Sequence, residues 1–330
     1  MVRNHEIRIG TRGSPLALWQ AHEVASRIAA TGGPSCRIVT IKTSGDRMQE
    51  APLSEVGGKR LFVKEIEEAL LSGEVDLAVH SSKDMPVVLP EGLVIGGVLP
   101  RDDPHDALVL PLPAAGDLNR RFPASATLED VISALGQSPT IGTGSVRRVA
   151  QLRRLFPRAR FQPIRGNLDT RLRKLDSAEH DALVVAAAGL RRLGFASRIS
   201  LTLPVEACVP APGQGIVAIE IRDADDRMRR VAAAVDDWAA AAALAAERAV
   251  VSALGGGCQT PVGALATAVG EDAIDLTAIV VAIDGDCAIR ATGRGDRVDA
   301  AAIGAEVGAR LLAKGAGEIL ADVRRGLGIG

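Results

Sequence analysis

Short apolar segments alternate with amphipathic ones over the first two thirds of the chain. Residues 6–30 predict a strand, a Gly-containing loop and a helix, with Ser14 as the N-cap before a proline at the first helical position. Residues 37–43 alternate like a strand, and the polar, Gly-rich segment 44–60 precedes an amphipathic helix. A buried strand then runs into a polar turn at 75–86. Such alternation predicts a parallel sheet with crossover helices.

The same pattern returns in the middle of the chain. Residues 139–157 and 160–175 each predict a strand, a polar loop and a helix. Residues 181–194 predict a strand followed by a loop that contains Gly189, Arg191 and Arg192. Because ligands bind beyond the carboxyl ends of strands in open α/β sheets, two such units facing each other would form a cleft.

The last third of the chain has a different pattern. Residues 209–222 combine a Pro/Gly turn with an apolar strand and resemble a segment that crosses between units. An Ala-rich helix is expected from Ala232 to Ser252, followed by alternating segments and a final helix from about Asp299 to Leu312. We therefore expect an α/β fold with two units around a cleft and a small α+β C-terminal domain.

Composition and charge narrow the range of partners. Aromatic residues make up only 2% of the 330 residues and Tyr is absent, which argues against a stacking platform for single-stranded nucleic acid. The net charge is -1, yet the window from Ile141 to Lys174 holds nine arginines, one lysine and a single acid, Asp169. A solvated basic helix face is the alternative explanation. Segregation of this strength favours an anionic partner for one region of the protein.

The cysteines and the N-terminus indicate the compartment. Four cysteines without a CxxC pair, and without histidines at metal-ligand spacing, make a disulfide framework or a structural metal site improbable. The N-terminus lacks the apolar stretch of a signal peptide, and no apolar run approaches the length of a membrane span. We expect a reduced, cytoplasmic protein with no membrane partner and no metal.

Two polar loops could carry chemistry. Arg12 precedes the N-terminus of the first predicted helix, where free N–H groups favour a carboxylate or phosphate. Lys83 and Asp84 follow a predicted strand; they could form only a surface ion pair. Alternatively, the carboxylate stabilises a developing cation or relays a proton while the lysine holds an anion.

A third loop presents a cysteine. Three glycines precede Cys258 and leave little to bury its thiol, which favours a nucleophilic or covalently modified group. A free cysteine is usually a small buried hydrophobe, and this interpretation suits Cys36 and Cys287. A cysteine protease would need a histidine as the partner of this thiol, and no histidine-containing segment of the sequence suits that role.

Eight motifs, in order, resemble the porphobilinogen deaminase (hydroxymethylbilane synthase) family. They are TRGSPLALWQA, VGGKRLFVKEIE, DLAVHSSKDMP, IGTGSVRR, RGNLDTRL, AAAGLRRLG, APGQGIVAIE and GGGCQTPVGA. The resemblance runs from about residue 7 into the C-terminal domain and is weakest over 111–138 and after 265. It implies two periplasmic-binding-protein-like α/β domains and a smaller third domain carrying the cysteine.

The family resemblance implies a transferase of tetrapyrrole biosynthesis. Members of the family join four porphobilinogen molecules head to tail into hydroxymethylbilane and release ammonia at each addition. They use a dipyrromethane cofactor held by a thioether, here to Cys258, while Asp84 stabilises the azafulvenium cation left by loss of ammonia. Segment 44–60 would be a lid that excludes water. The resemblance also implies a monomer with porphobilinogen and the growing chain as its partners.

The resemblance assigns further residues to two groups. The groups that would hold the cofactor are Ser81, Lys83, Thr143, Ser145, Arg147, Arg148 and Arg171. Those that would hold substrate or the growing chain are Arg12, Ser14, Gln20, Arg165 and Arg192. Arginine forks suit the acetate and propionate arms of each pyrrole, because they bind carboxylates in a bidentate manner.

The expected domains are residues 1–100 with 214–235, residues 101–213, and residues 236–330. Two positions depart from the family pattern: Gly255 stands where glutamate is common, and Gly144 stands where serine is usual. Segment 112–138 is longer than expected and is interpreted as a surface insertion.

Two other functions stay open at this point. A non-enzymatic anion-binding protein of the same two-lobed shape would bind a small carboxylate reversibly. A nucleic-acid-binding protein would use the basic window and show steep salt dependence, but the scarcity of aromatic residues disfavours it.

Overall fold

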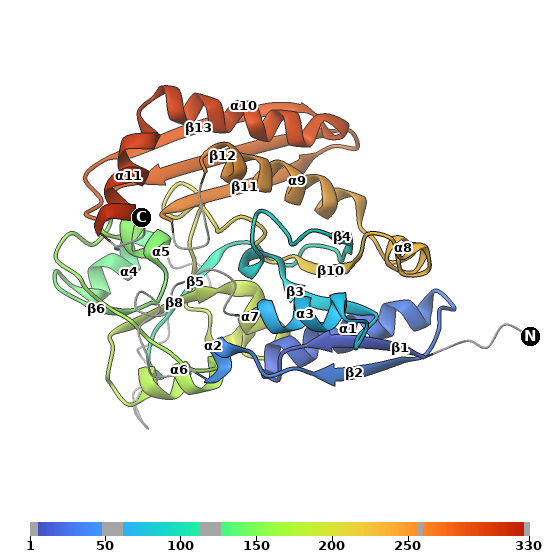
Figure 1. Ribbon diagram of the computed structural model, residues 1–330. Coiled ribbons are helices and arrows are strands. Elements are labelled where there is room, and N and C mark those ends of the chain that lie inside the picture. The colour runs from blue at the N-terminus through green and yellow to red at the C-terminus, as the bar shows by residue number, and fades with distance from the viewer. Residues whose placement is uncertain (1–5, 48–61, 113–126, 256–259, 327–330) are drawn as a thin grey trace, which may run out of the picture.

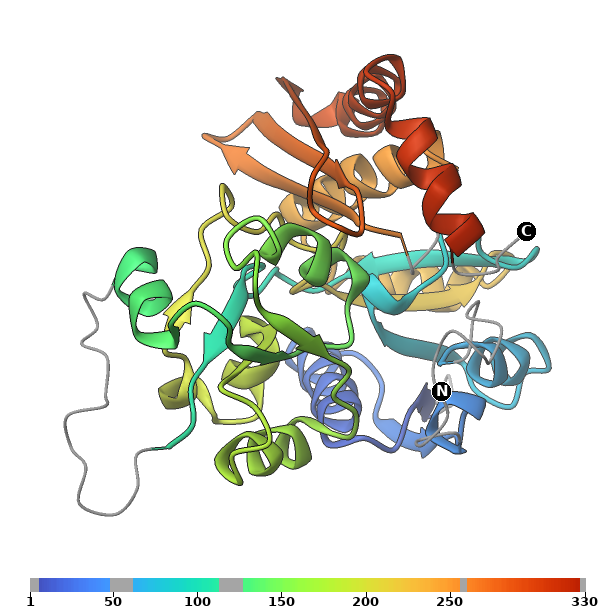
Figure 2. The same ribbon diagram turned by 90° about the vertical axis from the view of Figure 1, so that its left-hand side faces the viewer.

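The computed structural model describes residues 6–47, 62–112, 127–255 and 260–326, and its helices and strands form three units (Figure 1). Each unit has its own sheet. Figure 2, turned by 90°, shows the C-terminal unit lying across the other two. Segment 48–61, most of the predicted lid, and the Cys258 loop lie outside the described residues.

The first sheet has five strands. Their spatial order is β2 (Cys36–Thr40), β1 (Ile7–Thr11), β3 (Leu77–Ser81), β10 (Val217–Arg222) and β4 (Leu93–Val98). Both faces are covered by helices, which explains why β1, β3 and β10 are almost continuously buried. The covering helices are α1 (Pro15–Ala30), α3 (Lys64–Leu71) and α8 (Asp226–Ala233). Apolar side chains of α1 and α8 pack on one face of this sheet and those of α3 on the other.

The second sheet lies beside the first and has the same number of strands. Their order is β7 (Arg160–Gln162), β6 (Thr140–Gly142), β8 (Ala182–Ala186), β5 (Asp106–Val109) and β9 (Leu201–Thr202). Its helices are α4 (Leu128–Leu135), α5 (Val146–Leu152), α6 (Leu168–Asp176) and α7 (Ala187–Arg192), and a 3-10 turn, η3 (Ala196–Arg198), follows α7.

The predicted parallel pairing is found for β1 with β2 and β3 and for β6 with β7 and β8, but each sheet also contains antiparallel pairs. Strand β10 runs antiparallel to both neighbours, β3 and β4, and β5 runs antiparallel to β8 and β9. Both reversed strands adjoin the two stretches of chain that cross between the units, around 99–105 and 203–216. A local pattern of strand and helix does not record the direction in which a returning strand enters a sheet.

Segment 187–192 is a helix rather than the predicted loop. Helix α7 follows β8 directly and buries Ala187, Ala188 and Leu190. Gly189 signalled a loop in the sequence, but a glycine inside a short helix costs only about 1 kcal/mol, which this burial offsets.

The C-terminal unit is a three-stranded antiparallel sheet covered by helices. Strands β11 (Val262–Val269), β12 (Ala273–Val281) and β13 (Ala288–Asp296) lie against α9 (Trp238–Ala253) and α10 (Ala300–Ala313). Close contact between the two helices requires Gly304, because a Cβ atom there would lie 2.1 Å from the Ala246 carbonyl oxygen. The short turn η4 (Arg297–Asp299) precedes α10.

The helices of the C-terminal unit differ from the expectation in detail. The expected helix 232–252 is divided, because α8 ends at Ala233 and α9 begins after the N-cap Asp237, whose side chain accepts from the Ala240 N–H at 2.8 Å. Helix α10 agrees with the prediction, and α11 (Ala316–Gly326) follows it unpredicted. The predicted fold class, with two α/β units and a small α+β unit, is confirmed. No helix in the described ranges could cross a membrane.

Candidate active site

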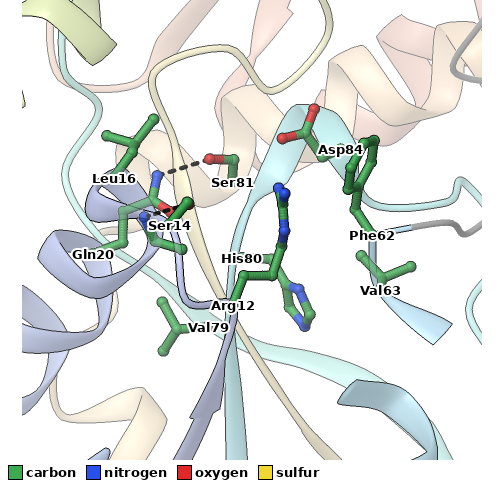
Figure 3. Close-up of a pocket in the computed structure, with 11 residues that line it drawn as sticks. Arg12, Ser14, Leu16, Gln20, Phe62, Val63, Val79, His80, Ser81 and Asp84 are labelled. Atoms are coloured by element: carbon green, nitrogen blue, oxygen red, sulfur yellow. Dashed lines mark hydrogen bonds between the residues drawn. The ribbon is translucent and has the colours of Figure 1, made fainter. Parts of the chain in front are cut away.

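A pocket opens where β1, α1 and β3 of the first unit meet. Figure 3 shows its lining, which contains Arg12, Ser14, Leu16, Ala17, Gln20, Phe62, Val63, Val79, His80, Ser81 and Asp84. Five of these residues belong to the predicted set: Arg12, Ser14, Gln20, Ser81 and Asp84. Two motifs that lie about 70 residues apart in the sequence therefore share one pocket, because β1 and β3 are neighbours in the sheet.

One wall of the pocket is the first turn of α1. The predicted N-cap is confirmed: the Ser14 hydroxyl accepts from the Ala17 N–H at 3.3 Å. One turn later, the Gln20 amide donates to the Ser81 hydroxyl at 2.8 Å and joins α1 to the end of β3. These bonds hold the polar groups of two elements at one edge of the sheet.

Arg12 extends from the loop after β1 and lies between two groups. Its guanidinium stacks 4.3 Å from the centre of the Phe62 ring and pairs with Asp46 of α2 (Ser44–Arg47) at 2.5 Å. Thr43 also donates to Asp46 from its N–H and its hydroxyl. Burial alone would raise the pKa of Asp46, but the bonds from Arg12 and Thr43 hold it below its usual range. Arg12 is thus a carboxylate-binding group that already holds a carboxylate.

A buried hydrogen-bonded pair joins the pocket lining to the neighbouring strand. His80 of β3 approaches Glu220 of β10, with 3.0 Å between Nε2 and Oε2 and both side chains at most 4% exposed. Sequence analysis singled out neither residue, because they lie 140 positions apart and no local motif joins them. The pair links the pocket strand to the strand that returns from the second unit.

Lys83 and Asp84 form the short turn η1 (Ser82–Asp84) directly after β3. Asp84 is exposed and faces the pocket beside Phe62 (Figure 3). Lys83 is half-buried, and this burial lowers the pKa of its ammonium to about 8. Asp84 opposes that shift and the positive charge of Arg148 adds to it. An anion placed beside Lys83 would therefore be held strongly.

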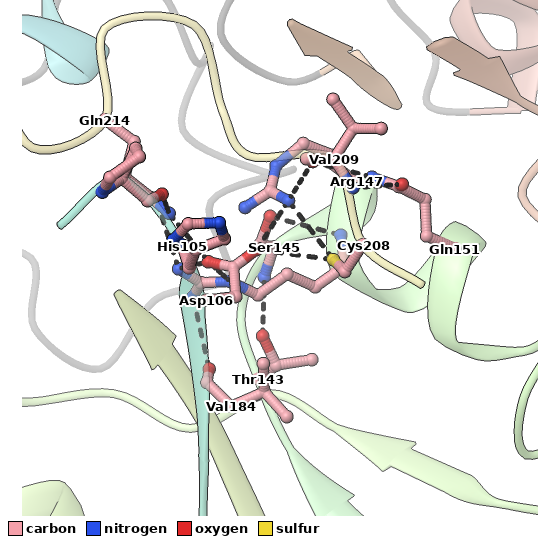
Figure 4. Close-up of polar contacts among 12 residues, drawn as sticks. His105, Asp106, Thr143, Ser145, Arg147, Gln151, Val184, Cys208, Val209 and Gln214 are labelled. Carbon is pink, nitrogen blue, oxygen red and sulfur yellow. Dashed lines mark hydrogen bonds and ion pairs between the residues drawn. The ribbon is translucent and has the colours of Figure 1, made fainter. Parts of the chain in front are cut away.

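The arginines at the start of α5 share one buried carboxylate (Figure 4). Arg147 and Arg148 each pair with a different oxygen of Asp106 at 2.7 Å, and Asp106 is fully buried. Burial would raise the pKa of Asp106, but the two guanidiniums hold it well below its usual range. Both arginine side chains are less than a tenth exposed. Two charges on one carboxylate still leave a local excess of positive charge.

The remaining predicted cofactor groups flank this pair. Ser145 is the N-cap of α5 and accepts from the Arg148 N–H at 3.4 Å, and its own N–H lies 3.4 Å from the buried Thr143 hydroxyl. Arg171 of α6 donates to the Gly166 carbonyl at 2.9 Å. Burial and the nearby charge of Arg148 lower the pKa of Arg171.

Two predicted substrate arginines have different surroundings. Arg165 is half-buried in the loop before α6. Arg192 of α7 is only 6% exposed, lies 3.2 Å from Asp102 and donates to the Gly215 carbonyl at 2.6 Å. Its guanidinium also lies 5.3 Å from the Trp19 ring centre. These contacts connect α7 to the crossing segments and to α1, and burial lowers the pKa of Arg192.

The described cysteines do not behave as expected. Cys36 is only partly buried and Cys287 is exposed, so the interpretation of both as buried hydrophobes is wrong. The buried thiol is Cys208, which donates to Asp106 at 3.3 Å and whose pKa burial raises to about 12. Within the described ranges no cluster of His, Cys, Asp and Glu could hold a metal ion.

Comparison with known proteins identifies the family. The family model described as "Porphobilinogen deaminase, dipyromethane cofactor binding domain" matches residues 7–230, and the porphobilinogen deaminase C-terminal domain matches 241–313. Porphobilinogen deaminase of Moorella thermoacetica is 44% identical over 97% of this chain and 97% of its own length. That of Syntrophotalea carbinolica is 44% identical over 96% of this chain and 95% of its own.

The likeness to solved structures is weaker. Immunogenic lipoprotein A from Vibrio vulnificus is 14% identical, with a TM-score of 0.38 over 69% of this chain and 94% of that one. The probable amino-acid ABC transporter extracellular-binding protein YtmK from Bacillus subtilis is 11% identical, with a TM-score of 0.39 over 70% and 90%. The two family models and the 44% identical relatives show that this chain belongs to the porphobilinogen deaminase family, enzymes that polymerise porphobilinogen into hydroxymethylbilane in tetrapyrrole biosynthesis.

Proposed function

We propose that this protein joins four porphobilinogen molecules head to tail into hydroxymethylbilane and releases ammonia at each addition. The observation that carries the proposal is the pocket, which brings Arg12, Ser14, Gln20 and Ser81 to one side of Asp84. In this pocket the Arg12 guanidinium can bind a carboxylate arm of the substrate, and the Asp84 carboxylate can stabilise a cationic intermediate. Membership of the family supplies the reaction.

Asp84 acts on the reacting pyrrole. Loss of ammonia leaves an azafulvenium cation with a positively charged pyrrole nitrogen, and a fixed carboxylate beside it lowers the energy of that cation. Asp84 is held by the turn η1 and is exposed at the pocket. Of the acids near the pocket, Asp46 is already paired with Arg12, whereas Asp84 faces the pocket itself.

The dipyrromethane cofactor fits the charges behind the pocket. The positive charge of Arg148 lowers the pKa of both Lys83 and Arg171, and the Arg147 Nε is buried without a hydrogen-bond partner in the described structure. Carboxylate arms placed there would complete the neutralisation that Asp106 begins. The groups that would hold the cofactor are Lys83, Arg147, Arg148 and Arg171 with Ser81, Thr143 and Ser145, and Cys258 would form its thioether. When bound, this group supplies the pyrrole carbon to which the first substrate unit is joined.

The domain boundaries stay part of the proposal. Residues 1–100 with 214–235 would form the first domain, 101–213 the second and 236–330 the third. The presence of β10 in the first sheet supports the return of the chain near 214. The monomeric state and the cytoplasmic location stay predictions.

Intact mass tests the proposal most directly. Protein purified from cells that make porphobilinogen should carry a covalent adduct of two pyrrole units. Cys258→Ser should lack the adduct, because the thioether sulfur is gone. Asp84→Asn should retain it and lose nearly all turnover, because a neutral amide stabilises the cation poorly. Cys287→Ser, which changes an exposed thiol, is the matched control and should retain both adduct and turnover. An unmodified wild-type mass together with reversible binding of a small carboxylate would favour the non-enzymatic alternative.

A further inference from the structure

Gln214 lies at the point where the chain crosses from the second unit back to the first. It sits in the segment 203–216, three residues before the start of β10, and it is fully buried. It stands in the motif APGQGIVAIE, but the sequence analysis gave it no role, and it does not line the pocket. A fully buried polar side chain at a crossing between units has to find all its partners there.

The two ends of the Gln214 amide face opposite kinds of group. The Nε2 group donates to the Pro104 carbonyl at 2.7 Å and to the Asp106 carboxylate at 2.9 Å. The Oε1 atom accepts from Lys83 Nζ and from Arg148 Nη2, both at 3.4 Å. One side chain therefore contacts the lysine of the first unit and both members of the Asp106–Arg148 pair of the second.

This combination of partners requires an amide. Only a neutral side chain with both a donor and an acceptor can give two hydrogen bonds to oxygens and take two from cations. A carboxylate would face Asp106 without a proton, and a lysine would face two cations. An apolar side chain of the same length would remove one hydrogen-bond partner from the buried Asp106 carboxylate and one from the half-buried Lys83 ammonium.

The backbone on either side of Gln214 is held just as firmly. Gly213 and Gly215 both have positive φ, 74° and 87°, and a Cβ atom on Gly215 would lie 2.4 Å from the Asp102 carbonyl oxygen. The Gly213 N–H donates at 2.6 Å to Glu247 of the C-terminal unit, whose carboxylate also pairs with Arg101. Arg101 in turn donates to the Gln214 carbonyl at 2.9 Å. The segment cannot shift without breaking contacts to all three units.

We propose that Gln214 is a positioning residue that fixes Lys83 and Asp84 of the first unit at a set distance from Arg148 of the second. This inference rests on the proposed function, in which Lys83 and Arg148 hold the cofactor and Asp84 stabilises the reacting pyrrole. The amide acts through Lys83 and Arg148, and the Lys83–Asp84 turn moves as one piece because η1 is only three residues long. Loss of the amide releases the two sets of groups from each other.

Gln214→Met and Gln151→Met form the matched pair of variants. Gln151 is also a buried glutamine whose amide both donates and accepts, but among the described residues this amide bonds only to the N–H and carbonyl of Val209, at 2.8 and 3.0 Å. Both variants should lower the urea midpoint, Gln214→Met by more, because three of the four bonds of the Gln214 amide involve charged groups whereas both bonds of the Gln151 amide involve neutral backbone groups. Gln214→Met should retain the two-pyrrole adduct and lose turnover, with kcat lowered about 10- to 100-fold, because small misplacement of reacting groups is costly. Gln151→Met should leave kcat within about two-fold of wild type, because none of the residues assigned to the cofactor or the substrate loses a hydrogen bond.

Gln214→Glu provides a second measurement, the pH profile of kcat. This profile would not change if Gln214 served only to stabilise the fold. Lys83 faces Asp84, Asp106, Arg147 and Arg148, and none of these changes in either Gln214 variant. Removal of the amide oxygen in Gln214→Met disfavours the ammonium and should move the alkaline limb of the kcat profile to lower pH. The new carboxylate in Gln214→Glu favours the ammonium and should move that limb to higher pH.

The outcomes separate the two proposals. Equal loss of kcat in Gln214→Met and Gln151→Met, or alkaline limbs that coincide with wild type, would overturn the role of Gln214 and leave the proposed function intact. A wild-type protein without the pyrrole adduct would instead overturn the proposed function. Opposite shifts of the alkaline limb, with the adduct retained, would support Gln214 as the positioning residue.

Discussion

Two arginine sites of this protein each hold a carboxylate, in different surroundings. At the pocket, Arg12 pairs with Asp46, and both side chains are about a quarter exposed, at 25% and 24%. Behind it, Arg147 pairs with Asp106 at a similar distance, but these side chains are only 4% and 0% exposed. Water screens the first pair and is absent from the second, so similar geometry corresponds to different energies.

The difference indicates a separation of roles. A pair that water and a ligand can reach is exchangeable, and a substrate carboxylate can take the place of Asp46 on Arg12. The buried pair cannot exchange its carboxylate cheaply, because either partner left alone would be an uncompensated buried charge. Asp106 therefore fixes its two arginines, whereas we propose that a substrate carboxylate displaces Asp46 from Arg12.

Replacement of Asp106 should give the largest effect. Asp106→Asn leaves two buried guanidiniums without their counter-charge, and we expect the free energy of unfolding to fall by about 3–5 kcal/mol. Urea unfolding at pH 7 measures the loss. The effect should shrink below about pH 4, because the carboxylate contributes stability above its unfolded pKa and loses it as pH falls toward the lower folded pKa.

Asp46→Asn is the matched control, with an expected loss below about 1 kcal/mol, as for exposed ion pairs. Equal losses for the two variants would show that burial does not distinguish the two carboxylates.

Removal of the charge of Lys83, which lies between the two sites, should give a smaller effect of opposite sign. The folded-state pKa is about 8 against 10.5 for the free group, so the folded protein binds the proton less well than the unfolded chain. Below pH 8 the buried ammonium costs stability, and between pH 8 and 10.5 wild type recovers that cost as the proton leaves. Lys83→Met should therefore raise the free energy of unfolding at pH 7, by up to about 3 kcal/mol.

Unfolding measured from pH 7 to 10.5 checks the sign, since the advantage of Lys83→Met should vanish toward the alkaline end. The control is Lys64→Met, because Lys64 is a surface lysine at 62% exposure paired with Glu68. If Lys83→Met were less stable than wild type over this whole pH range, the charged Lys83 would not destabilise the folded protein, contrary to the prediction.

The exchangeable pair should give the smallest effect. Asp46→Asn frees Arg12 from a charge that substrate has to displace, so KM for porphobilinogen should fall about 2- to 5-fold, the range for an exposed ion pair. The turnover number should stay near wild type, because Asp84 is unchanged. Steady-state kinetics measures both, and Arg12→Lys, which loses the planar fork, should raise KM. A raised KM in Asp46→Asn would show that Asp46 orients Arg12 rather than competing for it.

Part of the site was predictable because it depends on short-range patterns. Ser14 before a proline predicted its N-cap, and the ends of β1 and β3 predicted that the loops of Arg12 and Asp84 lie at one edge of the sheet. Charge segregation predicted an arginine-rich region around α5 and α6. It gave no indication of which arginines are exposed, since Asp106 lies 41 residues before Arg147 and outside the basic window.

The sequence by itself determined the order of elements, the helix start at Ser14, the basic window and the family motifs, because each depends on neighbours within a few residues. Only the tertiary structure decided that β10 returns antiparallel beside β3, that Asp106 takes both Arg147 and Arg148, and that Gln214 joins them to Lys83. The Asp106–Arg147 and Gln214–Lys83 contacts join residues 41 and 131 positions apart. Their energies depend on burial, and burial depends on which distant segments pack around each charge.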